Sequence, residues 1–223
     1  MSVRAGEIVG LYGLIGAGRS EFVTTLYGRH HKSAGQVLWQ GKPVHINSEH
    51  DAIKLGMALA PESRRDQGLC LNLPVGLNLN LPIYKRISNN MLISGAKEKA
   101  EADRQIAGLR IKTPTRGALA SSLSGGNQQK IVIGKWLAHG AKLFIFDEPT
   151  VGVDVSTRVA IYRLIADLCE AGAGILLISS DLPEVLHLCN RAYVMFRGHV
   201  QVELQGRQIT EDSVLSHFFE RAA

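Results

Sequence analysis

The stretch that decides the fold is Leu123-Ser124-Gly125-Gly126-Asn127, which continues into Gln128-Gln129-Lys130. The sequence predicts that a helix over 127–137 follows the two glycines. The first N–H groups of a helix lack intrahelical partners and carry partial positive charge, so a helix start attracts anions. Glycine lets a phosphate approach the backbone closely because it has no side chain. The stretch therefore predicts a phosphate contact.

A second glycine-rich segment is Gly13-Leu14-Ile15-Gly16-Ala17-Gly18-Arg19-Ser20-Glu21. It lies between a strand expected over 7–12 and a helix expected over 19–27. The pattern G-x-x-x-x-G-K-[ST] surrounds phosphates with backbone N–H groups, with Lys on the terminal phosphates and Ser or Thr on Mg²⁺. Here Ser20 fits, but Arg19 replaces Lys and is too large and planar for a tight loop. Glu21 adds a negative charge nearby, so the segment predicts a degenerate phosphate loop.

Two carboxylates, Asp147 and Glu148, end an apolar strand expected over 143–146. Open α/β sheets bind ligands at the carboxyl ends of their strands. The pair is therefore a candidate for chemistry at the phosphates. An acidic junction between a strand and a loop is the alternative interpretation.

Composition favours one α/β domain. The chain has 223 residues, of which 45% are hydrophobic, enough for a globular core with a small helical insert. The net charge of +5 comes without a dense Lys/Arg block, which argues against a nucleic-acid partner. The three cysteines show no metal-ligand spacing and indicate a reducing compartment. Apolar runs are far shorter than the ~20 residues of a membrane helix, so membrane contact requires a partner.

Strands alternate with helices along the chain, which is typical of a mostly parallel sheet. Further strands are expected over 57–60 and 174–179, with hairpins over 36–46 and 193–204. Further helices are expected over 48–56, 96–109, 157–170, 182–188 and 210–221. Residues 62–94 are expected to be less regular.

The phosphate loop, the segment at 123–127 and the Asp-Glu pair, in this order, resemble the ATP-binding cassette (ABC) ATPases, in which the segment at 123–127 is called the signature. The resemblance implies an α/β P-loop NTPase fold with an ABC-type core, in which a parallel sheet has an antiparallel β edge. It implies a single ABC domain over 1–223, with a RecA-like core over about 1–70 and 135–223. An inserted helical subdomain covers about 71–134. The implied cofactors are ATP and Mg²⁺.

The resemblance also assigns roles. Asp147 and Ser20 would hold Mg²⁺, and Glu148 would orient or deprotonate the attacking water. Asp154, in Gly152-Val153-Asp154, matches an aspartate of a loop that crosses the ABC dimer interface. Nucleotide binding would involve the loop from Gly13 to Glu21 and the signature.

Two more positions depart from the family pattern. Glu62 stands where most members have a glutamine near the metal and the water. Ser180 stands where a histidine contacts the γ-phosphate, and serine is shorter and uncharged. Together with Arg19, these departures predict that the isolated chain is weak or inactive as an ATPase. In the family that the chain resembles, strands with an adenine-stacking aromatic residue precede the phosphate loop, whereas here only residues 1–12 do. Either the stacking residue is supplied differently or the chain begins inside its domain, and we expect a fragment of a longer two-cassette chain.

Several segments together are distinctive of one class: Gly-Ala-Gly-Arg-Ser-Glu at 16–21, Pro-Glu-Ser-Arg at 61–64, Gly-Val-Asp-Val at 152–155 and Ile-Ser-Ser-Asp-Leu at 178–182. The chain resembles the second, C-terminal cassette of the fused proteins that power bacterial monosaccharide import, of the ribose, galactose and xylose type. The resemblance implies an ATP hydrolase that drives transport. Its signature would complete an ATP site on another cassette, while its own loop forms the weaker site.

The implied partners are the N-terminal cassette of the same or a sister chain, a transmembrane sugar permease and, indirectly, a periplasmic or extracellular sugar-binding protein. No nucleic acid is implied. The implied location is the cytoplasmic face of the bacterial inner membrane, as a peripheral protein. A non-catalytic regulatory nucleotide-binding cassette is one alternative. A DNA-repair ABC ATPase is less favoured, because heptads and paired cysteines are missing.

The segment 64–81 has an apolar residue at every second position from Leu69 to Leu79. We expect part of this series in the core and part in an apolar patch that a permease could contact.

Overall fold

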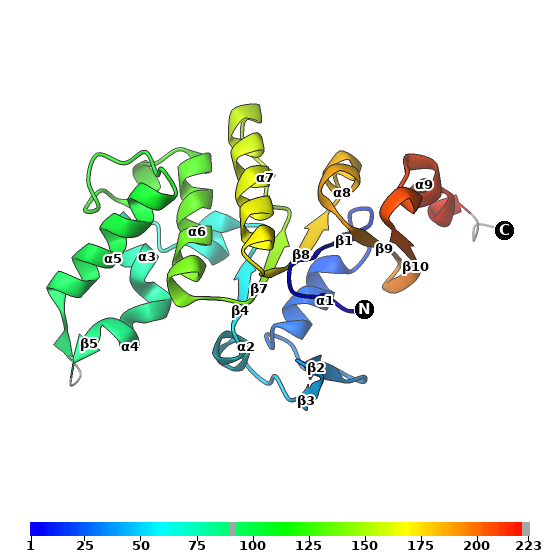
Figure 1. The fold of residues 1–223 in the computed structure, drawn as a ribbon, viewed down its shortest axis with the longest axis horizontal. Coiled ribbons are helices and arrows are strands. Elements are labelled where there is room, and N and C mark those ends of the chain that lie inside the picture. Colours follow the sequence, from blue (N-terminus) through cyan, green and yellow to red (C-terminus); the bar gives the residue numbers. More distant parts are fainter. Residues whose placement is uncertain (90–91, 220–223) are drawn as a thin grey trace. The chain divides into compact units, whose positions relative to one another are not determined.

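The computed structural model describes residues 1–89 and 92–219 and divides into two units. The core unit comprises Met1–Leu59, Lys142–Glu148 and the chain from Tyr162 onward. The helical unit comprises Ala60–Ala141 and Pro149–Ile161. Figure 1 labels their elements. The helical unit thus includes more of the chain than the expected 71–134.

A six-stranded sheet forms the centre of the core unit, in the order β10-β9-β1-β8-β7-β4. Its strands are β1 (Ile8–Tyr12), β4 (Met57–Ala60), β7 (Leu143–Asp147), β8 (Gly174–Ser179), β9 (Arg191–Phe196) and β10 (His199–Gln205). β1 runs parallel to β8 and β9, β7 runs parallel to β8, and β10 pairs antiparallel with β9. Buried, apolar strands joined by helices favour parallel pairing. The predicted α/β fold with an antiparallel edge is confirmed.

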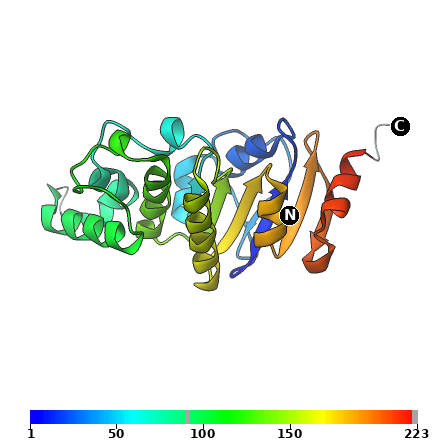
Figure 2. The same ribbon diagram turned by 90° about the horizontal axis from the view of Figure 1, so that it is seen from above.

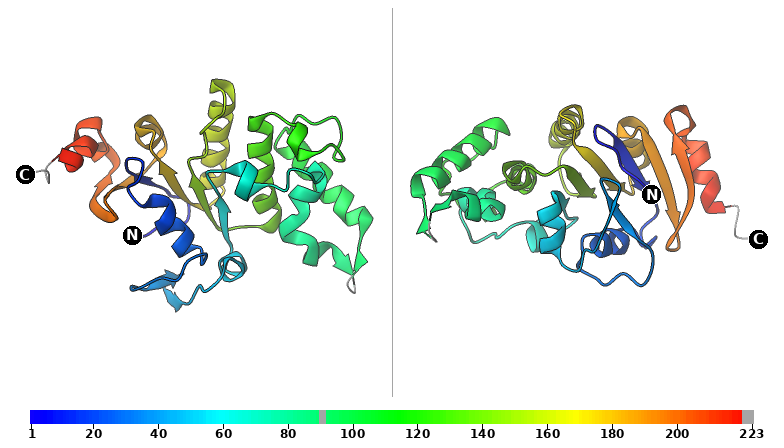
Figure 3. Two further views of the ribbon diagram at one scale, coloured as in Figure 1. Left: turned by 180° about the vertical axis from the view of Figure 1, so that it is seen from behind. Right: turned by 60° about the horizontal axis from the view of Figure 1, so that its bottom comes forward.

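Helices cover both faces of this sheet. They are α1 (Arg19–Leu26), α2 (Glu49–Leu55), α8 (Leu182–Leu188), α9 (Glu211–Phe219) and the end of α7 (Val155–Glu170). α1 lies on one face and α8 on the other (Figure 2), and the blue α1 is in front when the molecule is seen from behind (Figure 3). Side chains alternate along a strand, so Leu11 packs with Val23 of α1, whereas Tyr12 packs with Val185 of α8.

The shorter elements of the core unit also match their sequence patterns. β2 (Val37–Trp39) and β3 (Lys42–Val44) form the expected hairpin, and a short 3₁₀ turn covers Gly206–Gln208. Ser48 caps α2, because its hydroxyl accepts a hydrogen bond from the Asp51 N–H. The expected helix over 210–221 is described over Glu211–Phe219, and residues 220 and 221 lie outside the described residues.

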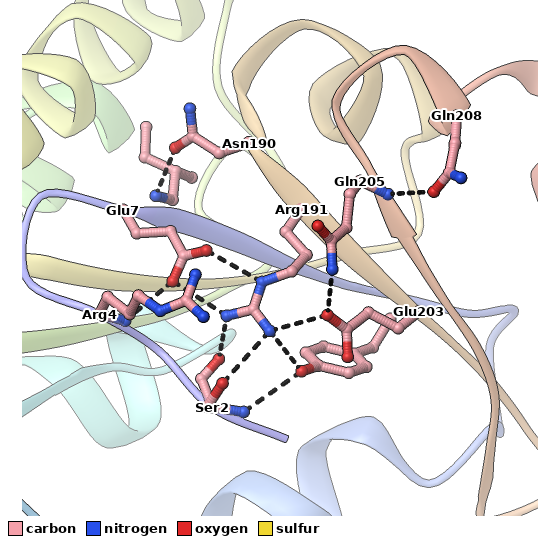
Figure 4. A network of polar contacts seen from close by, with 10 residues as sticks. Ser2, Arg4, Glu7, Asn190, Arg191, Glu203, Gln205 and Gln208 are labelled. Atoms are coloured by element: carbon pink, nitrogen blue, oxygen red, sulfur yellow. Dashed lines mark hydrogen bonds and ion pairs between the residues drawn. The ribbon is translucent and has the colours of Figure 1, made fainter.

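A buried arginine ties the start of the chain to the antiparallel edge (Figure 4). The Arg191 guanidinium donates to Glu7 at 2.9 and 3.0 Å, to Glu203 at 3.0 Å and to the Ser2 carbonyl at 2.7 Å. The hydrogen bond to Glu7 raises the pKa of Arg191 above its usual value, although burial opposes this. Burial raises the pKa of Glu7, but its hydrogen bonds and the charge of Arg191 outweigh burial and lower it. The network holds residues 2–7 on β9 and β10.

The helical unit is more ordered than the sequence suggested. It contains a π-helical turn (Arg64–Gly68), α3 (Val75–Asn80), a 3₁₀ turn (Leu81–Ile83), α4 (Tyr84–Ile87), β5 (Ser88–Asn89), β6 (Leu92–Ile93), α5 (Gly95–Gly108), a 3₁₀ turn (Ala120–Ser122), α6 (Gly125–His139) and the start of α7. Residues 62–94 were expected to be less regular, and the described part of that range consists of short elements separated by turns and loops. Asn78, which locally favours a turn, is buried within α3. Its amide donates to three carbonyls and accepts from the Cys70 N–H at 2.8 Å.

The apolar series at 69–79 divides as expected between core and surface. Leu69, Val75 and Leu79 are buried, whereas the Leu73 side chain is 37% exposed. The packing of α3 against α6 depends on a close approach at Gly134. A Cβ there would lie 2.8 Å from Cδ2 of Leu79 and 2.7 Å from Cδ1 of Leu109. Whether a permease contacts the exposed part stays a prediction.

Candidate nucleotide and signature sites

The phosphate loop follows β1 at the carboxyl end of the sheet, where this fold class binds ligands. Gly16 and Gly18 have φ values of +81° and +91°, which favour glycine. At Gly13 a Cβ would lie 2.6 Å from the Met195 carbonyl oxygen, so the loop needs glycine to lie against β9. No side chain of the described residues caps the N-terminus of α1. The loop and the helix start suit a phosphate group.

Arg19, the first residue of α1, points into this site. Its side chain is 8% exposed, and Nη1 lies 3.0 Å from Oε1 of Glu148, itself 9% exposed. The contact is an ion pair whose angles do not form a hydrogen bond. The Ser180 N–H donates to the same Oε1 at 2.8 Å. The core unit therefore brings together Arg19, Glu148 and Ser180, which are far apart in the sequence.

The backbone of Glu148 is bent out of the strand geometry. Its φ is +48°, which is uncommon for a residue with a side chain. Its N–H donates to the Ile178 carbonyl at 3.0 Å, which continues the pairing of β7 with β8 beyond Asp147. Such a conformation persists where the surroundings hold it, here through the ion pair and the two hydrogen bonds.

The candidate metal ligands are in the same unit. Asp147 ends β7 and is 5% exposed, and Ser20 is half-buried in the first turn of α1. The described residues hold no cluster of three or more acidic, His or Cys side chains that could bind a metal by itself. Mg²⁺ commonly uses one or two protein ligands together with nucleotide phosphates, and Ser20 and Asp147 fit that arrangement. Glu21, the next residue after Ser20, is exposed and adds a negative charge beside the phosphate loop.

The signature lies at the start of α6 in the helical unit. α6 begins at Gly125, two residues earlier than expected, and no described side chain caps it. The Asn127 side chain donates to the Ser124 hydroxyl at 2.9 Å and accepts from the Lys112 N–H at 2.8 Å. Asn127 therefore fixes the entry into the helix, while the first N–H groups stay suitable for an anion.

Both signature glycines meet side chains of this same chain. A Cβ at Gly125 would lie 2.6 Å from Nη2 of Arg64, and a Cβ at Gly126 would lie 2.4 Å from Cγ2 of Thr157. The sequence pattern indicated the approach of a phosphate as one reason for glycine here. Glycine is also required for packing within the helical unit.

The predicted interface aspartate, Asp154, caps α7. Its carboxylate accepts from the Ser156 hydroxyl at 2.6 Å and from the N–H and hydroxyl of Thr157 at 2.9 and 2.7 Å. These hydrogen bonds, that from Ser156 first, lower the pKa of Asp154. Asp154 thereby positions Thr157 against Gly126.

Sequence reasoning singled out Glu62 but assigned no role to Arg64, two residues further on. Glu62 is exposed. Arg64 donates to the carbonyls of Val151 and Gly152 at 3.0 and 3.3 Å and lies over Gly125. The hydrogen-bond partners of Arg64 are backbone carbonyls, which every residue has, so the sequence alone could not indicate this contact.

Comparison with known proteins agrees with this geometry. A family model described as "ABC transporter" matches residues 1–151, more than half of the chain. The ribose import ATP-binding protein RbsA of Pseudomonas putida is 42% identical over 216 residues, which cover 97% of this chain and 42% of that protein. The arabinose import ATP-binding protein AraG of Paraburkholderia xenovorans is 44% identical over 216 residues, with 96% and 42% covered.

A solved structure, a nucleotide-free ATP-binding cassette from an ABC transporter, superposes with a TM-score of 0.80 at 22% identity. The match covers 97% of this chain and 87% of that one. The chain belongs to the ABC transporter family and has the fold of an ABC ATPase cassette. It spans about two fifths of the length of the two sugar-import relatives. Among the described residues, no helix combines the length and apolar character needed to cross a membrane.

Proposed function

We propose that the chain is an ATP-binding subunit of a bacterial ABC importer for a monosaccharide and completes an ATP site on another cassette. The names of the relatives support the transport class, and the ribose and arabinose proteins differ in their sugar, which leaves the sugar open. The chain matches less than half of each relative, which is consistent with a C-terminal cassette beside a second one. ABC cassettes of this kind pair head to tail.

The buried ion pair between Arg19 and Glu148 carries the proposal that this chain's own site is the weaker one. A base that activates water needs a free carboxylate oxygen within hydrogen-bond reach of that water. Oε1 of Glu148 already faces the guanidinium at 3.0 Å and accepts from the Ser180 N–H at 2.8 Å. Because a guanidinium and an N–H both engage this oxygen, the main role of Glu148 is to hold Arg19 in place rather than to orient a water.

Each unit then has its own task. Magnesium-bound ATP supplies the γ-phosphoryl group whose transfer to water drives the transport cycle. In the core unit, the loop from Gly13 to Gly18 binds phosphates, and Ser20 and Asp147 hold the metal. In the helical unit, the N–H groups at Ser124 to Gly126 face the phosphate held by the other cassette, where negative charge develops.

The proposed partners follow from this division of tasks. They are the N-terminal cassette of the same or a sister chain, a transmembrane sugar permease and, through the permease, a periplasmic or extracellular sugar-binding protein. The proposed location is the cytoplasmic face of the inner membrane. A regulatory cassette that binds nucleotide and never takes part in hydrolysis is the second candidate, because the same ion pair suits it. The signature test below separates the two.

The test compares two variants in the reconstituted transporter. Gly125→Asp places a carboxylate at the helix start and should nearly abolish ATP hydrolysis and sugar uptake. Loss of one set of oxyanion donors costs about 10²–10³ in rate. Glu148→Gln should have a much milder effect when activity is expressed per folded transporter, since this change also lowers stability. Ser121→Asp, at an exposed position before α6, serves as the charge control. Equal damage from Gly125→Asp and Glu148→Gln contradicts the division between the two sites.

The isolated chain supplies a second measurement. It should release little phosphate at saturating Mg-ATP, and Arg19→Lys alone should not restore activity because Glu62 and Ser180 remain. Robust turnover that disappears in Glu148→Gln contradicts a weak site.

A further inference from the structure

We infer that Arg64 is a positioning residue of the composite site and that it determines why residue 125 is glycine. This inference rests on the proposed function, because it concerns the surface that completes the other cassette's ATP site. Arg64 holds the loop that follows Glu148, residues 149–154, beside the start of α6. The signature and the loop then act as one surface toward the other cassette.

The contacts place Arg64 between two segments that are distant in the sequence. Its two terminal nitrogens donate to the successive carbonyls of Val151 and Gly152, at 3.0 and 3.3 Å. Nη2 also lies 2.6 Å from where a Cβ of residue 125 would be. All of these residues belong to the helical unit. A planar guanidinium presents two donors in a fixed fork that matches two neighbouring carbonyls, whereas an ammonium is a compact group that must place both contacts on one nitrogen.

The position of Arg64 is itself fixed to α6. Arg64 is the first residue of a π-helical turn that the Ser63 hydroxyl caps by accepting from the Asp66 N–H. At the other end of the turn, the buried Lys135 of α6 donates to the Gly68 carbonyl at 2.6 Å. The Ser63 cap keeps the turn intact and the Lys135 contact ties it to α6, so movement of α6 is expected to move Arg64 and, through it, the loop.

The glycine at 125 follows from this arrangement. A side chain there would meet the flexible end of Arg64 first, ahead of the Gly152 carbonyl oxygen at 3.4 Å. Alanine at 125 would therefore displace the guanidinium from its two carbonyls and leave α6 intact. Arg64→Ala and Gly125→Ala should therefore have the same consequence: each releases the loop over residues 149–154 from its contact with Arg64.

A double-mutant cycle in the assembled transporter tests this coupling. The variants are Arg64→Ala, Arg64→Lys, Gly125→Ala and the double variant Arg64→Ala/Gly125→Ala, with Arg65→Ala, at the exposed neighbouring residue, as control. Misplacement of a positioning surface can cost up to about 10²-fold in rate. We expect each single variant to lower kcat for ATP at least about tenfold, with KM changed little because the other cassette's loop binds the nucleotide. The double variant should be no worse than the worse single variant, and Arg64→Lys should rescue only part of the activity.

Hydrogen exchange at residues 149–154 of the same proteins measures the tether directly. Arg64→Ala should increase exchange there, whereas Arg65→Ala should not. Multiplying effects in the double variant, or unchanged exchange in Arg64→Ala, overturn the inference. If the Arg64→Ala transporter keeps full ATPase activity while the Gly125→Asp transporter is inactive, the inference is overturned and the proposed function stands. Full activity of both variants overturns both.

Discussion

Removing one partner of the Arg19–Glu148 pair should destabilise the chain far more than removing both. At an N–O separation of 3.0 Å, two unit charges attract by about 5 kcal/mol at an effective dielectric constant near 20. Burial costs several kcal/mol for each ion, so the pair contributes little net stability. A single change leaves an uncompensated buried charge, which costs about 3–5 kcal/mol. Arg19→Met should cost less than Glu148→Gln, because the Ser180 N–H still donates to Glu148.

The assay is urea unfolding of the wild type, both single variants and the double variant Arg19→Met/Glu148→Gln. The double variant should be less destabilised than either single variant, so the coupling energy should be at least about 3–5 kcal/mol, the cost of one uncompensated charge. Arg29 and Glu49 supply a matched control, because they form the same kind of pair at 2.9 Å with side chains 41% and 46% exposed. Their coupling should stay below about 1 kcal/mol. Equal coupling energies in the two cycles would refute the argument that burial makes the Arg19–Glu148 pair interdependent.

Three further outcomes follow from packing and protonation. Gly126→Ala should lower the free energy of unfolding by about 1–3 kcal/mol through overpacking, because its Cβ would lie 2.4 Å from Cγ2 of Thr157. In urea unfolding, adding Thr157→Ala should restore much of that loss. If it does not, the loss comes from the backbone at residue 126. Burial lowers the pKa of Lys135 to about 8, so above pH 8 the unfolded chain binds more protons than the folded chain. The free energy of unfolding should therefore rise by about 1.4 kcal/mol per pH unit up to about pH 10. Lys135→Met should remove this slope, and an unchanged slope would assign it to other groups. Despite burial, Arg191 and the hydrogen bonds of Glu7 hold the Glu7 pKa low. The stabilisation from the Glu7 carboxylate is therefore present at pH 7 and is lost as the pH falls through that lowered pKa. Glu7→Gln should lower the free energy of unfolding more at pH 7 than at pH 2, and an equal loss at both pH values would contradict the linkage.

The elements of the core unit could be predicted because local pattern and tertiary environment agree there. The buried strands β7 and β8 are continuous apolar runs, and the helices begin at recognisable caps such as Ser48. Residues 64–87 could not be predicted, because their helices are short and depend on partners elsewhere. The buried amide of Asn78, which has four hydrogen-bonding contacts in α3, is the clearest case. These hydrogen-bond partners are brought to Asn78 by the folded chain, so they cannot be recognised from the local sequence pattern.

The candidate site divides in the same way. The sequence pointed to Arg19 as an irregular residue in the phosphate loop, and to Glu148 as a candidate base. That the two form an ion pair depends on β8, which lies between β1 and β7 in the sheet. Likewise the need for glycine at 126 comes from Thr157 on another helix. Sequence spacing indicates which segments belong to the site, but the strand order and helix packing determine which atoms meet.

The Arg19–Glu148 pair also limits the evolutionary routes open to this chain. A change to lysine at position 19 exchanges a planar group that reaches Glu148 for a compact ammonium with a different geometry. Any change at 148 alone leaves the arginine charge buried at 8% exposure. Each first step therefore crosses a less stable intermediate, and proteins have little stability to lose. On the proposed function, a hydrolytic site in this unit would therefore require the two positions to change nearly together.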